Sequence, residues 1–188
     1  MWHVRICYSA IVIFLLCAVS AAAQSSSSNK NQGEAAEFEQ RAREYVRMRE
    51  GIEGQMPKLP KAATAEQIEA HKSELLKRVL AARTGATQGQ IFTPAASAMI
   101  RSIIATEFKG RQREDLKKEV FEIAAQGVPV AVNVEYPESK EMLEVPATLL
   151  LALPQLPKQL RYRLVGTYLL LVDRENNLII DFMPNALP

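Results

Sequence analysis

The spacing of apolar residues changes along this chain, and each change predicts a different kind of element. From Ala35 to Glu50 apolar positions recur every three or four residues, which is the period of an amphipathic helix. Phe38, Tyr45 and Val46 fall on its apolar stripe. The segment GIEGQMPKLPKAA follows, and its two glycines and two prolines predict a hinge after this helix.

Two further helices are predicted before residue 128. One begins after Thr64, because Thr64 and Gln67 have the spacing of a capping box, and it ends near Gly85. The next has Thr93 as its N-cap and Pro94 as its first helical residue. The stripes that should be buried are Ile68, Leu75, Leu76 and Val79 in the first helix, and Ala96, Ile100, Ile103, Ile104 and Phe108 in the second. The helical period resumes over 116–124.

From Val128 the period becomes two. Residues 128–136 alternate between apolar and polar positions, which predicts a strand with one wet face. A short helix should start at Pro146, and a meander of three strands should follow over 160–165, 168–172 and 178–182. We therefore expect an α+β fold, with amphipathic helices packed on a small antiparallel sheet of about four strands.

The first residues, MWHVRICYSAIVIFLLCAVSAAAQ, have the pattern of a secretory signal peptide. Arg5 supplies a positive charge, an apolar stretch follows, and the run of three alanines ending at Ala23 is typical of a cleavage site. An uncleaved membrane anchor is the alternative, since Ile6 to Ala23 is nearly long enough to span a bilayer. Both readings place the rest of the chain outside the cytoplasm, in a periplasm or secreted.

This reading gives four regions. They are a signal peptide over 1–23, a disordered serine-rich tether over 24–34, a helical arm and hinge over 35–62, and an α+β domain over 63–188.

Removing the signal peptide changes the inventory of reactive side chains. Both cysteines, Cys7 and Cys17, leave with it, so we expect no disulfide and a fold stabilised by burial alone. The full chain has 23 basic and 21 acidic residues, and cleavage removes one basic residue, Arg5, and no acidic one. The net charge therefore falls to about +1. A nearly neutral, exported chain is not expected to bind nucleic acid.

Two aspartates near the ends of the last two strands could form a catalytic or metal-binding pair. Asp173 opens the loop DRENN, where an aspartate side chain accepts hydrogen bonds from turn backbone. Asp181 should lie within the last strand, opposite Leu169 or Leu170, where an ion pair with Arg161 or Arg163 would contribute about 0.2–1 kcal/mol. Because strands rise about 3.3 Å per residue, the two carboxylates should lie too far apart to share a metal, and we expect structural roles.

Other chemical candidates are few. His71 is the one histidine left after cleavage, and we expect a partly buried helix residue rather than a base or a ligand. The charged run Lys109, Arg111, Arg113, Lys117 and Lys118 is interleaved with acidic residues, which favours a solvated helix face over an anion-binding or membrane-surface patch.

The carboxy-terminal half resembles a family of small exported bacterial proteins that has no assigned activity. The resemblance rests on IFTPAASAMIRSII, on VAVNVEYPES, and on LLLALPQLPKQLRYRLVGTYLLLVDRENNLIIDFMPNALP. It covers about Ile91 to Pro188, roughly half of the chain, and it implies no catalytic residue.

These observations favour an exported, non-enzymatic protein that binds another protein or an envelope component. We expect no cofactor, no metal and no catalytic residue, and we leave the oligomeric state open. Phe38, Tyr45 and Val46 are the candidate partner-binding residues, with packing on the body of the protein as the alternative. A hydrolase of envelope glycans that uses carboxylates such as Glu107 or Glu135, or a small-ligand carrier, are the alternative functions.

Overall fold

The computed structural model describes the backbone of residues 7–107, 114, 118, 129–137, 139–140 and 142–187, and the side chains from residue 29 onward in these ranges. The helices are α1 (Cys7–Gly54), α2 (Ala65–Ala82), α3 (Pro94–Glu107) and α5 (Ala147–Ala152). The strands are β1 (Leu143–Glu144), β2 (Leu160–Val165), β3 (Tyr168–Asp173) and β4 (Ile179–Met183). The strands form one antiparallel sheet in the order β1-β2-β3-β4, which confirms the expected α+β fold.

One expected strand is absent from its predicted place. Of the described residues in 128–136, only Glu135 forms a bridge to the sheet, with Leu178, and β1 is supplied by Leu143–Glu144 instead. The chain turns at Asn133, whose φ of 63° lies in the left-handed region that asparagine tolerates better than most residues. The Asn133 side chain exchanges two hydrogen bonds with Arg83, at 2.7 and 3.0 Å, and these hold the turn.

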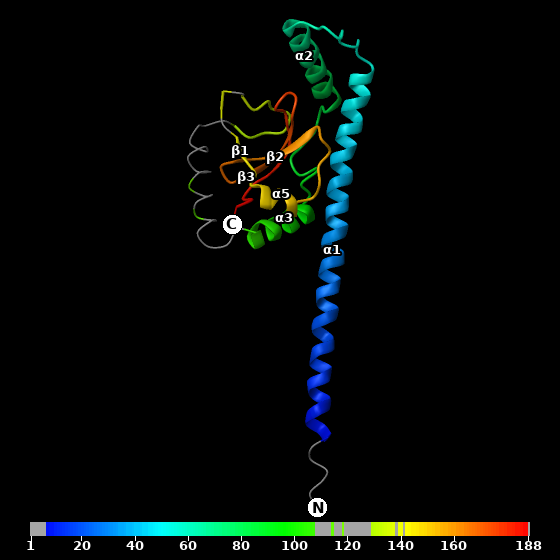
Figure 1. The fold of residues 1–188 in the computed structure, drawn as a ribbon, viewed down its shortest axis with the longest axis vertical. Coiled ribbons are helices and arrows are strands. Elements are labelled where there is room, and N and C mark those ends of the chain that lie inside the picture. Colours follow the sequence, from blue (N-terminus) through cyan, green and yellow to red (C-terminus); the bar gives the residue numbers. More distant parts are fainter. Residues whose placement is uncertain are drawn as a thin grey trace, which may run out of the picture.

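Helix α1 runs along the flank of the body, and α3 and α5 lie together at one end of it (Figure 1). Their apolar side chains form the main core with Leu160, Tyr162, Leu164, Leu169 and Leu171 of the sheet. The opposite face of the sheet buries a smaller cluster, which consists of Tyr136, Val165, Leu170, Val172 and Ile179. Strand β3 therefore has a covered surface on both sides, as its continuous apolar sequence predicts.

The amino-terminal arm is part of the core. Phe38, Tyr45 and Val46 are all buried, and the Phe38 ring lies 5.2 Å from Phe92 and 6.2 Å from Tyr162. The three side chains expected as candidate partner-binding residues therefore pack on the body, which was the alternative. Side chains of 35–62 and of 63–188 share one core, so the expected arm packs on the expected domain.

The segment 24–34, expected to be a disordered tether, lies within α1. Serine costs less than about 0.7 kcal/mol relative to alanine in a helix, so a run of four serines does not by itself end one. The hinge follows Gly54 rather than Glu50.

The helix caps follow the sequence prediction closely. The Gln67 backbone nitrogen donates to Thr64 Oγ1 at 3.3 Å, and the Thr64 backbone nitrogen donates to Gln67 Oε1 at 2.9 Å, which completes the capping box. Thr93 Oγ1 accepts from the Ala96 nitrogen at 3.2 Å at the start of α3. Ile68, expected on the buried side of α2, is exposed, and Phe108 lies outside the described residues.

Among the residues whose side chains are described, no helix combines the length and the apolar character that crossing a membrane requires.

Candidate functional site

Asp173 is a buried anchor for α1 as well as a turn residue. Its Oδ1 accepts from the Glu175 backbone nitrogen at 3.0 Å, which is the turn bond that the sequence predicts. Its Oδ2 accepts from Tyr45 Oη at 2.7 Å and from Arg49 Nε at 3.0 Å. Burial, and after it the neighbouring Asp173 carboxylate, raises the pKa of Tyr45, so the phenol remains a donor at neutral pH.

Arg49 completes this network from α1. Its guanidinium also donates to Glu53 Oε2 at 2.8 Å and to Glu175. The Arg83 guanidinium lies over the Tyr45 ring, 5.2 Å from its centroid. Because the donors and acceptors of this network are matched inside the chain, its role is to hold α1 against the β3–β4 hairpin.

Asp181 is fully buried, and the expected surface ion pair with Arg161 or Arg163 is wrong. Its Oδ1 accepts from the backbone nitrogens of Gly89 and Phe182, both at 2.8 Å. Its Oδ2 accepts from the backbone nitrogens of Ile91 at 2.7 Å and Phe92 at 2.8 Å. One carboxylate thus fixes the loop that leads into α3.

A register shift explains the wrong prediction for Asp181. Leu171 pairs with Asp181, whereas Val172 pairs with Ile179, so one extra residue of β4 lies between these two pairs. Such a bulge interrupts the strict alternation of faces, and it places Asp181 on the helix-covered face beside Ile180. The expected partners, Leu169 and Leu170, instead pair with Met183 and Phe182.

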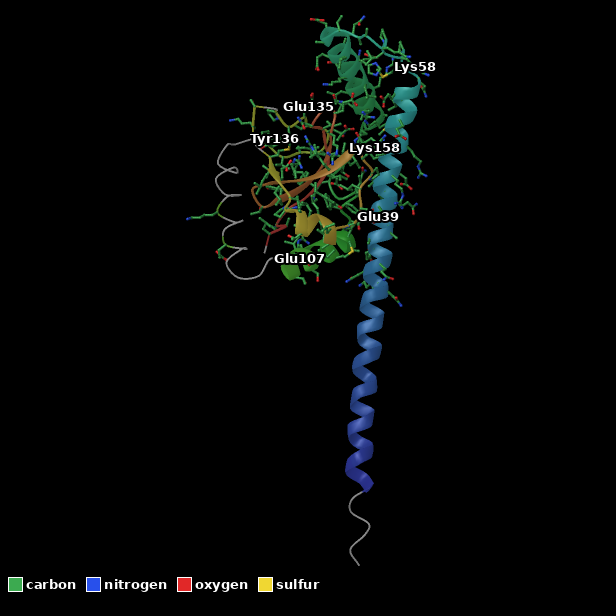
Figure 2. All side chains as sticks on the ribbon, viewed as in Figure 1. Glu39, Lys58, Glu107, Glu135, Tyr136 and Lys158 are labelled. Carbon is green, nitrogen blue, oxygen red and sulfur yellow. The ribbon has the colours of Figure 1, made fainter. Side chains whose placement is uncertain are left out.

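The remaining sequence candidates do not assemble a reactive centre. His71 is half-buried in α2 and lines a groove of about 430 Å³ with Glu50, Glu53 and residues of the hinge. Glu107 and Glu135 are exposed and lie at opposite ends of the body (Figure 2). Of the five basic residues of the charged run, only Lys118 is described, and it is exposed. The described residues contain no cluster of three or more side chains that would hold a metal ion.

Three arginines and one lysine line a groove of about 280 Å³ between α5 and β2, which we call the α5–β2 groove. Its lining comes from three places: the end of α5, the Leu-Pro segment after it, and the strand β2 with the turn after β3. The lining residues are Leu150, Leu151, Pro154, Gln155, Leu156, Pro157, Lys158, Leu160, Arg161, Tyr162, Arg163 and Arg174.

Neutral acceptors orient the three guanidinium groups of this groove. Arg174 Nε donates to the Leu160 carbonyl and Arg163 Nη1 to the Tyr162 carbonyl, both at 3.0 Å. Arg161 donates through Nη2 to the Asn177 side chain, while its Nε is buried and has no partner. A buried donor without an acceptor is uncommon in a folded protein.

The charges of the groove are poorly compensated. Among the described residues, the one ion pair to its four basic groups joins Arg163 Nη2 to Glu144 at 3.0 Å, and the Glu144 side chain is 83% exposed. Burial, and after it the nearby Arg174, lowers the pKa of Arg161. Burial, and after it Arg161, lowers the pKa of Arg163. The guanidinium groups therefore repel one another, and an anion in the groove would relieve this repulsion.

Sequence reasoning missed this groove, although two signals were present. Arg161 and Arg163 alternate with apolar residues on β2, which places both on one face of the sheet. The six-residue helix α5 carries three successive leucines. Successive residues of a helix point in different directions, so one buried side cannot take all three. What the sequence does not show is that Arg174 and the end of α5 line one groove with these two arginines.

Comparison with known proteins adds no relative to this description, because no family model, no curated protein and no solved structure matches the chain.

Proposed function

We propose that this chain is an exported, non-enzymatic binding protein and that its α5–β2 groove takes the anionic group of an envelope component. The observation that carries the proposal is the gathering of Arg161, Arg163 and Arg174, which have one carboxylate partner, Glu144, in the part of the chain that the structure describes. A planar guanidinium binds phosphate or carboxylate oxygens through two parallel hydrogen bonds.

The lining of the groove favours binding over catalysis. It contributes cations and apolar side chains, and its one hydroxyl, on Tyr162, donates to the Pro154 carbonyl at 3.0 Å. Burial raises the pKa of Tyr162 well above the ordinary value, so this phenol is no base at neutral pH. A fixed set of donors without a nucleophile or a base holds an anion and leaves it chemically unchanged.

Titration with a simple anion tests the proposal. Inorganic phosphate and glycerol 3-phosphate, each added at constant ionic strength with chloride as the reference, should raise the melting temperature along a saturation curve. A ligand at one hundred times its dissociation constant adds about 2.7 kcal/mol to the free energy of unfolding.

Paired variants locate the effect. The variant Lys158→Gln/Arg174→Gln should lose most of the stabilisation by phosphate, whereas Arg43→Gln/Arg47→Gln, which removes two exposed charges from α1, should keep it. An equal response of both double variants, or a response no larger than that to chloride, would contradict the proposal.

A further inference from the structure

Two exposed leucines line the α5–β2 groove, and binding of a small anion by the arginines gives them no role. Within α5, Leu149 is buried, but Leu150 is 46% exposed and Leu151 is 89% exposed. Both exposed leucines line the groove that holds the arginines. A leucine left this far in water forgoes the stabilisation that burial gives, so two of them side by side form a surface the fold leaves uncovered.

Apolar side chains that project beside a cluster of cations match the chemistry of a lipid–water boundary. Interfacial segments place leucines 5–10 Å deep, at the boundary between headgroups and acyl chains, and place lysines and arginines among the headgroups. Each cation near an anionic surface strengthens binding about fivefold. The two exposed leucines and the four basic groups of the groove supply both parts of this arrangement.

We infer that the α5–β2 groove docks on an anionic lipid surface. Leu150 and Leu151 enter the headgroup–acyl boundary, while Lys158, Arg161, Arg163 and Arg174 hold the phosphate groups of the headgroups. This inference rests on the proposed function, because the same cations bind the anion, and it adds that the anion belongs to a lipid in a membrane.

The relative exposure of the lining favours a lipid surface over a small soluble anion. Leu151 is 89% exposed, whereas the Arg163 side chain is 15% exposed, so the leucine is far more open to solvent than this cation. A phosphate held by the arginines alone would leave Leu151 in water. A lipid covers both, because its headgroup and its acyl chains are joined.

The position of α5 in the molecule agrees with this reading. Helix α5 lies with α3 at the end of the body beyond which α1 continues toward residue 7 (Figure 1). Where the apolar start of α1 is kept as an uncleaved anchor, the membrane that receives it lies on the α5 side of the body.

Hydrogen exchange read by mass spectrometry on the full chain tests the inference. The readout is local, so it reports on α5 whether or not the apolar segment 6–23 also inserts into the vesicle. Peptides that cover 147–159 are followed with vesicles of pure phosphatidylcholine and with vesicles that contain phosphatidylglycerol at about one lipid in three.

We expect exchange in these peptides to slow at least fivefold with the anionic vesicles compared with the neutral ones. The variant Leu151→Ser and the variant Lys158→Gln/Arg174→Gln should each remove the difference. Matched controls are Leu59→Ser, which changes an exposed leucine of the hinge, and Arg43→Gln/Arg47→Gln on α1, and both should retain it.

The outcomes separate this inference from the proposed function. Equal exchange with both kinds of vesicle, while phosphate still stabilises the chain through Lys158 and Arg174, would overturn lipid docking and leave the anion site standing. Equal exchange together with no response to phosphate would overturn both. Protection that survives Leu151→Ser would also overturn docking, because the leucines would then play no part.

Discussion

Replacing Asp181 with asparagine should destabilise the protein more than any single surface change. The carboxylate accepts four backbone hydrogen bonds, two at each oxygen. Asparagine keeps one accepting oxygen and presents an amide, itself a donor, to the other pair of N–H groups. Two bonds to a charged group are lost, worth about 1.5–3 kcal/mol each, and partial access of water to Gly89 and Phe182 offsets some of the loss.

The expected loss is therefore about 3–4 kcal/mol in the free energy of unfolding, or roughly 10 °C in melting temperature for a chain of this size. Urea titration followed by circular dichroism measures it, with Glu69→Gln as an exposed control that removes one carboxylate. Amide exchange at Gly89 should accelerate in the same variant. A loss below 1 kcal/mol with an unchanged denaturant slope would refute the account of Asp181 as the support of the loop before α3.

Four further predictions concern α1 and α2. Arg49→Met should cost about 3–5 kcal/mol in a urea titration, because Asp173 would keep a buried charge without its cation. A chain that starts at Ala63 should show no cooperative melting by circular dichroism, since it lacks the α1 side chains of the core. Stability should fall above about pH 10, where the unfolded chain loses the Tyr45 proton that the folded chain retains, and Tyr45→Phe should flatten this slope by up to about 1.4 kcal/mol per pH unit. Thr64→Ala should lower stability by about 1 kcal/mol through loss of the capping box, and an unchanged melting temperature would argue against that role.

Local signals in the sequence predicted the elements whose causes are local. Thr64 and Thr93 cap α2 and α3 because their hydroxyls reach nitrogens a few residues away. The apolar run of β3 predicted a strand covered on both faces, and the hairpin after it formed where Asp173 opens the turn.

The errors arose where a distant partner decides the conformation. The left-handed turn at Asn133 depends on Arg83, fifty residues earlier, and it removes a strand that alternation alone predicts. The bulge before Asp181 turns this side chain to the helix-covered face of the sheet. There, three of the four backbone nitrogens that donate to Asp181 belong to the loop before α3. The α5–β2 groove likewise forms only because α5, β2 and Arg174 come together in the folded chain. The spacing of residues along the sequence does not predict this arrangement.

The bond between Tyr45 and Asp173 has a consequence for how the chain matures. These two residues are 128 positions apart, so Tyr45 finds the acceptor of its hydroxyl only when nearly the whole chain has been made. Phe38 can pack on Phe92 and Tyr162 earlier, but Tyr45 and Arg49 lack their shared carboxylate until Asp173 has been made. Such a separation makes closure of the core slow and late, and a nascent chain that stops short of β4 would remain a substrate for chaperones and proteases.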